Sequence, residues 1–76
     1  MRLSDLKIGK EGKVQSVDII NVPLKRHLLE MGLTCGCTVK VVRKSPMEDL
    51  ICLQLRGYEL ALRNAEAKFI TVEVIR

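Results

Sequence analysis

One histidine and three cysteines are the residues of this 76-residue chain whose side chains most readily bind transition metals. Cys35 and Cys37 are separated by a single glycine, while His27 precedes them and Cys52 follows. Thiolates and imidazole together could supply the four ligands of a tetrahedral zinc or iron site. However, the spacing of one residue lacks the usual C-x-x-C turn, and Cys52 is expected to point outward from a distant strand. We therefore favour the interpretation that these cysteines occupy ordinary turn and strand positions.

The cysteines also bear on the compartment in which the chain works. Their odd number argues against a disulfide framework and fits a reducing environment. The first seven residues contain no apolar signal-peptide core, and no segment approaches the roughly 20 apolar residues of a membrane span. We expect a cytoplasmic protein.

Catalytic chemistry is not predicted for this chain. For His27 to act as a general base, it would need an orienting carboxylate and a nucleophile, and the sequence identifies neither. There is also no Ser-His-Asp arrangement, glycine-rich phosphate loop or pair of carboxylates in a recognisable pattern. We expect that the protein is not an enzyme.

The excess of basic residues leaves two interpretations open. Thirteen Lys and Arg against nine Asp and Glu give a formal charge of +4. Arg43, Lys44, Arg56 and Arg63 could gather on one outer face, either as a docking surface for an acidic partner or as an ordinary solvated face. Nucleic-acid binding is not expected, because one Tyr and one Phe offer few aromatic side chains for base stacking.

A short amphipathic helix positions several of these residues. Leu24, Leu28 and Met31 recur at helical spacing and form one apolar stripe. Asn21 can cap the start of the helix, and a proline fits its first turn. Gly32 suits the left-handed position just after the helix ends.

Strands surround this helix. The pattern predicts strands over residues 13–20, with a bulge near Ser16, and over 38–42, 50–56, 59–63 and 70–74. Asn64 is expected to cap a helical turn at residues 65–67. Five short strands with one helix after the first predict a small, strongly bent barrel. The inward side chains are predicted to be Val39, Val41, Ile51, Leu53, Leu55, Leu60, Leu62, Ile70, Val72 and Val74.

Several segments appear together and in a familiar order. They are Leu3–Gly9, the run Leu28–Leu33 behind a basic residue, then Gly36, Arg43–Pro46, Leu55–Arg63 and the pair Glu66-Ala67. In these segments, and over almost its whole length, the chain resembles the FeoA family of small proteins that accompany the bacterial ferrous iron transporter FeoB. Cys35 departs from the family pattern, which often has proline there, and Glu48 and Leu50 replace a usual glycine and proline.

The resemblance implies both a fold and a function. The fold would be mainly β: an SH3-like small five-stranded barrel, comprising residues 1–76 as one domain and shared with the C-terminal domain of iron-dependent repressors. No DNA-binding region precedes it here, so a free-standing FeoA is expected. The implied function is that of a cytosolic accessory protein, recruited to the inner face of the membrane by docking on the cytoplasmic part of FeoB, which it would modulate. The alternative is a transition-metal-binding or metal-sensing domain. We expect that no cofactor is required, although ferrous iron or zinc could bind. The formation of a weak homodimer is a further alternative.

Two segments form the predicted docking surface. The helix carries basic residues and leucines that fall partly off the apolar stripe, and the loop after the second strand is predicted to be exposed. The predicted docking residues are Lys25, Arg26, Leu29, Leu33, Pro46, Met47 and Glu48.

Overall fold

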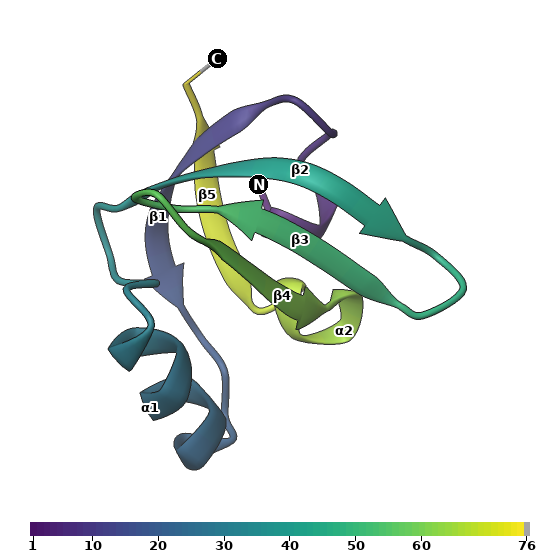
Figure 1. Ribbon diagram of the computed structural model, residues 1–76. Coiled ribbons are helices and arrows are strands. Elements are labelled where there is room, and N and C mark those ends of the chain that lie inside the picture. The colour runs from purple at the N-terminus through teal and green to yellow at the C-terminus, as the bar shows by residue number, and fades with distance from the viewer. Residues whose placement is uncertain (76) are drawn as a thin grey trace.

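Five antiparallel strands form one bent sheet in the computed structural model, which describes residues 1–75 (Figure 1). A short 3-10 turn, Leu3–Asp5, precedes them. The elements then follow in the order β1 (Glu11–Val17), α1 (Val22–Glu30), β2 (Thr38–Ser45), β3 (Leu50–Gln54), β4 (Glu59–Arg63), α2 (Asn64–Ala67) and β5 (Ile70–Val74). The predicted five-stranded architecture with a helix after the first strand is confirmed.

The strands pair in the order β4-β3-β2-β1-β5. The register between β1 and β5 shifts between Val14 and Ser16, which confirms the predicted bulge. A second shift, which the sequence pattern did not indicate, lies between Val41 and Arg43 where β2 pairs with β3. Bulges bend and twist a strand locally, so these two irregularities help to curl the sheet around its core.

The N-terminal segment covers the outer edge of β5, which the sequence did not predict. Arg2 forms an isolated bridge with Thr71, and the backbone N–H of Val72 donates to the carbonyl oxygen of Met1 at 2.7 Å. Leu3 and Leu6, next to this bridge, are fully buried. The segment therefore protects an exposed strand edge and contributes to the core.

The core is aliphatic and follows the alternation of the strands. All of the predicted inward residues of β2, β3 and β4 are buried, as are Ile70 and Val72 of β5. Val74 is a correction, because its side chain is 44% exposed at the end of β5, beyond the core. Among the described residues no charged or polar side chain is buried in this core.

Some predicted strand ends are wrong. β1 ends at Val17, because the chain then leaves the sheet to reach α1, and β3 ends at Gln54 before the turn into β4. β2 continues to Ser45, since its pairing with β3 extends to Ser45 opposite Leu50. These ends depend on strand pairing, which local sequence patterns do not encode.

Helix α1 begins and ends as predicted. The Oδ1 atom of Asn21 accepts a hydrogen bond from the backbone N–H of Leu24 at 3.1 Å, and Gly32 has a φ of +96°. Leu28 is buried, and Leu24 and Met31 pack partly against the core. Within the described part of the chain, no helix is long and apolar enough to cross a membrane.

Two expectations near the helices are wrong. Leu33 was predicted to be exposed, but it is fully buried, because the chain turns inward after Gly32 and the N–H of Leu33 bonds back to the carbonyl of Leu28 at 3.0 Å. Asn64 does not cap α2, since it is the first residue of that helix. Instead, the carboxylate of Glu66 accepts from the backbone N–H of Arg63 at 3.0 Å.

Candidate functional site

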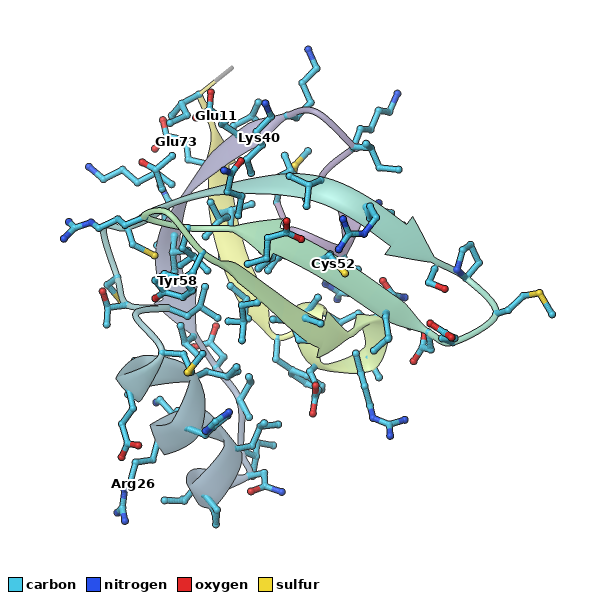
Figure 2. All side chains as sticks on the ribbon, viewed as in Figure 1. Glu11, Arg26, Lys40, Cys52, Tyr58 and Glu73 are labelled. Carbon is cyan, nitrogen blue, oxygen red and sulfur yellow. The ribbon has the colours of Figure 1, made fainter. Side chains whose placement is uncertain are left out.

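The helical part of the predicted docking surface is exposed. Arg26 projects from α1 away from the sheet (Figure 2), and Leu29 is 38% exposed. Lys25 is half-buried, and His27 is exposed on the same helix. With Leu33 removed from the set, α1 still presents two basic residues and one leucine to solvent.

The loop part of the predicted surface lies elsewhere. Met47 is fully exposed, and the carboxylate of Glu48 accepts a hydrogen bond from the hydroxyl of Ser45 at 3.1 Å. The loop follows β2 at one end of the molecule, whereas α1 lies at the opposite end (Figure 1). The helix and the loop are therefore two separate surfaces, because the β2–β3 hairpin carries residues 46–49 away from α1.

An apolar groove beside α1 contains functional candidates that the sequence did not identify. It has a volume of about 250 Å³ and lies between the start of α1 and α2. Ile20 is 85% exposed, and Phe69, the only phenylalanine of the chain, is 50% exposed. The lining residues are Ile19, Ile20, Asn21, Leu24, Ala65, Glu66 and Phe69. The residues that line the groove come from two segments that are far apart in the sequence. The groove could therefore have been predicted only from evidence that these two segments contact each other.

Tyr58 lies next to Gly32, the glycine that follows the end of α1. Its hydroxyl lies so close to Gly32 that a β-carbon on Gly32 would collide with it. Figure 2 shows Tyr58 between the sheet and α1. Gly32, Tyr58 and Cys37 line a pocket of about 260 Å³ together with Arg56. A side chain at position 32 would therefore require the Tyr58 side chain to move.

The metal-binding candidates do not come together. Cys35 is exposed, Cys37 and Cys52 are half-buried, and all three are free thiols. Among the described residues, no group of three or more His, Cys, Asp or Glu side chains is placed to hold a metal ion. Cys52 lies on the outer face of β3, well away from α1 and therefore from His27 (Figure 2). The tetrahedral arrangement of Cys35, Cys37, Cys52 and His27 is thus not formed.

Burial raises the pKa of the Cys37 thiol above its ordinary value of 9.0. Hydrogen bonds from the backbone of Thr34 and of Cys37 itself oppose this rise, as does the nearby charge of Arg56. Because burial is the largest effect, the neutral thiol is favoured at Cys37. A neutral thiol is a weak nucleophile and a poor metal ligand.

Two of the four basic residues expected on one face, Arg43 and Lys44, have partners in the structure. The Arg43 guanidinium forms an ion pair with the carboxylate of Glu59 at 2.8 Å. This carboxylate is the main cause of a raised pKa of Arg43, and Cys52 also contributes to the rise. The ammonium group of Lys44 donates to the carbonyl oxygen of Ser4 at 3.4 Å. Arg56 lies near Cys37. Arg43 and Lys44 are therefore engaged within the chain, and a docking surface that combines all four residues stays a prediction.

A family model described as the FeoA domain matches residues 1–74. An Fe(2+) transport protein A/Fe(2+) transporter FeoB fusion protein of Porphyromonas gingivalis is 37% identical over 75 residues. That match covers 99% of this chain but 9% of the fusion protein, so the chain spans a small part of its relative.

Solved structures agree with this match. The FeoA protein of Chlorobium tepidum is 37% identical, with a TM-score of 0.91, over 100% of this chain and 71% of that chain. The zinc complex of FeoA from Stenotrophomonas maltophilia, described as an SH3 domain protein, is 33% identical, with a TM-score of 0.81, over 96% of this chain and 89% of that chain.

The likeness extends further in fold alone. A manganese-dependent transcriptional repressor is 16% identical, with a TM-score of 0.88, over 99% of this chain and 41% of that chain. This agrees with the predicted sharing of an SH3-like domain with metal-dependent repressors. The family model and both FeoA structures match nearly the whole chain, and so this chain belongs to the FeoA family.

Proposed function

We propose that this protein docks on the cytoplasmic part of a FeoB-type transporter and modulates ferrous iron uptake. The observation that supports this most directly is the relative in which a domain 37% identical to this chain is fused to a FeoB transporter. Fusion keeps two partners at a high effective concentration, as expected when their separate forms must associate. Iron is then the cargo of the partner, and this chain acts by binding without covalent chemistry.

The exposed side of α1 is the part of this chain best suited to docking. Leu29 offers an exposed apolar side chain, and Arg26 beside it offers a positive charge. Interfaces combine an apolar centre with a charged rim in this manner, and arginine is enriched in them. The loop between β2 and β3, which contains Met47, lies at the other end of the molecule from α1 (Figure 1), and we place the contact on α1.

A binding measurement with the purified FeoB cytoplasmic domain tests this proposal. We expect wild-type protein to bind, and we expect Leu29→Glu and Arg26→Glu each to weaken binding by roughly tenfold or more. Met47→Glu is the matched control, because it places the same charge on a fully exposed residue of the other surface. Uptake of radioactive ferrous iron in cells should fall with the same variants. If wild type fails to bind the domain, the proposal is wrong.

Direct metal binding is the alternative function, and the zinc complex of the Stenotrophomonas relative is the observation in its favour. The described residues of this chain gather no cluster that would hold such an ion. Titration with zinc and with ferrous iron under reducing conditions distinguishes the two functions. Stoichiometric binding that Cys35→Ser or Cys37→Ser abolishes would favour the metal-binding function.

A further inference from the structure

We infer that the groove between α1 and α2 receives one bulky apolar side chain of an acidic segment in the partner. The inference rests on the proposed function, because the segment is placed in the cytoplasmic part of a FeoB-type transporter. The groove combines a concave, mainly apolar lining with two highly exposed hydrophobic side chains, Ile20 and Phe69.

The size of the groove sets the size of its occupant. A volume of about 250 Å³ accommodates a single leucine or phenylalanine side chain but not a whole helix face. Ile20 and Phe69 both line it and remain 85% and 50% exposed. Exposed large apolar side chains that line a concavity are typical of a binding site, whereas scattered ones are not. An inserted side chain would cover both walls at once.

The surrounding charges determine the polarity of the segment that carries this side chain. Six charged residues lie within two positions of a lining residue, and four of them are basic: Lys25, Arg26, Arg63 and Lys68, against Asp18 and Glu66. The two carboxylates are already engaged, since Asp18 accepts from the hydroxyl of Ser16 at 3.0 Å and Glu66 accepts from the backbone of Arg63.

Helix α1 adds to this positive field. Its first turn contains no acidic residue, so the positive end of the helix dipole is not neutralised there. Asn21, which caps that end, lines the groove. Lys25 follows the lining residue Leu24 in α1, and Lys68 precedes the lining residue Phe69 after α2. Carboxylates on both sides of the inserted side chain would fit these charges.

Two sets of variants test the inference with the purified FeoB cytoplasmic domain as the probe. The first set is Ile20→Ser and Phe69→Ser, for which we expect binding to weaken by roughly tenfold or more. Ile8→Ser is the matched control, since Ile8 is 58% exposed in the segment before β1. The second set is the double variant Lys25→Glu/Lys68→Glu. Its control is Lys7→Glu/Lys10→Glu, which changes the net charge by the same amount away from the groove.

The charge reversal should weaken binding by roughly tenfold at low salt, and the difference from its control should shrink at about 0.5 M salt, where screening is strong. Ile20 and the two lysines are at least partly exposed, so these variants are expected to fold, and circular dichroism checks this. If wild type does not bind, the proposed function and the inference both fail. If wild type binds and the groove variants match their controls, only the inference fails.

Two further outcomes would also overturn the inference. If the serine variants lose binding but the lysine variant equals its control, the acidic character of the segment is wrong. Sedimentation of the protein alone tests a second copy as the occupant. A dimer that Phe69→Ser dissociates, and that competes with the FeoB domain, would mean that the groove serves self-association.

Discussion

Gly32 connects helix α1 to the sheet, and two independent constraints act on it. Its φ of +96° lies in the left-handed region that L side chains rarely adopt. The hydroxyl of Tyr58 also occupies the space that a β-carbon would need. The first constraint could be anticipated from a glycine placed after an amphipathic helix, whereas the second comes from a tyrosine in the β3–β4 connection and needs the fold.

Alanine substitutions at Gly32 and at Gly36 separate the effect of the backbone conformation from the effect of the Tyr58 hydroxyl. We expect Gly32→Ala to lower the free energy of unfolding by about 1–2 kcal/mol for the backbone. The Tyr58 side chain, which is 39% exposed, must also move away from the new β-carbon, and this displacement should cost about a further 0.5–1.5 kcal/mol. Gly36→Ala is the matched control, because Gly36 has a φ of +92° and nothing within 4 Å of an added β-carbon. Urea denaturation measures both variants. The additional loss should disappear in a Tyr58→Phe background, and equal losses in the two alanine variants would contradict the role of Tyr58.

The Cys37 thiol makes the stability of the folded protein depend on pH. Its pKa in the folded protein is raised above 9.0, chiefly by burial, so the folded state favours the neutral thiol. This contribution to stability is therefore present below about pH 9 and is lost as the pH rises through the folded pKa. We expect iodoacetamide to alkylate Cys37 with a pH midpoint that is higher in the folded protein than in urea. Mass spectrometry of the labelled peptide measures both midpoints, and a lower folded midpoint would contradict the effect of burial.

At the scale of elements, the sequence predicted helix α1 and the strand faces but not where every element ends. The apolar stripe, Asn21 and Gly32 are local signals, and local hydrogen bonds stabilise a helix. The strand ends at Val17 and Ser45 depend on partners elsewhere in the chain, and Asn64 was mistaken for a cap because the same residue type also occurs as a first helical residue. Leu33 was misplaced because helical spacing was extended past a glycine that ends the helix.

Asn21 caps α1, whereas Asn64 does not cap α2, so the two residues provide a matched pair for testing the contribution of a side-chain cap. Removing the cap in Asn21→Ala should cost about 0.5–2 kcal/mol, because the N–H of Leu24 loses its acceptor. Asn64→Ala should change stability by less than about 0.5 kcal/mol, because it removes no side-chain cap of α2. Thermal unfolding followed by circular dichroism measures both variants. A larger loss for Asn64→Ala would mean that its side chain supports α2 in a way that the cap geometry does not reveal.

At the scale of the whole molecule, long-range contacts decide what the sequence could not. A small bent barrel was predictable from five alternating segments and one helix, which leave few arrangements, and the family resemblance implied its SH3-like form. The candidate groove was not, since it brings together Ile20 and Phe69 from opposite halves of the chain. The docking surface was expected to be continuous, but the bent sheet separates α1 from Met47. Residue types and motifs thus indicated the function of the family, whereas the location of the candidate groove depends on how segments that are distant in the sequence pack together.

The N-terminal segment makes the strongest prediction at this scale, because Leu3 is fully buried beside the bridge between Arg2 and Thr71. A chain of 76 residues has a total stability of about 4–11 kcal/mol. Leu3→Ala should remove about 2–5 kcal/mol of it, since the truncation leaves a cavity at a fully buried position. Ile8→Ala, a change of similar size at a 58% exposed residue, should remove less than about 0.5 kcal/mol. Guanidinium denaturation measures both, and similar small losses would mean that the barrel is stable without its first residues.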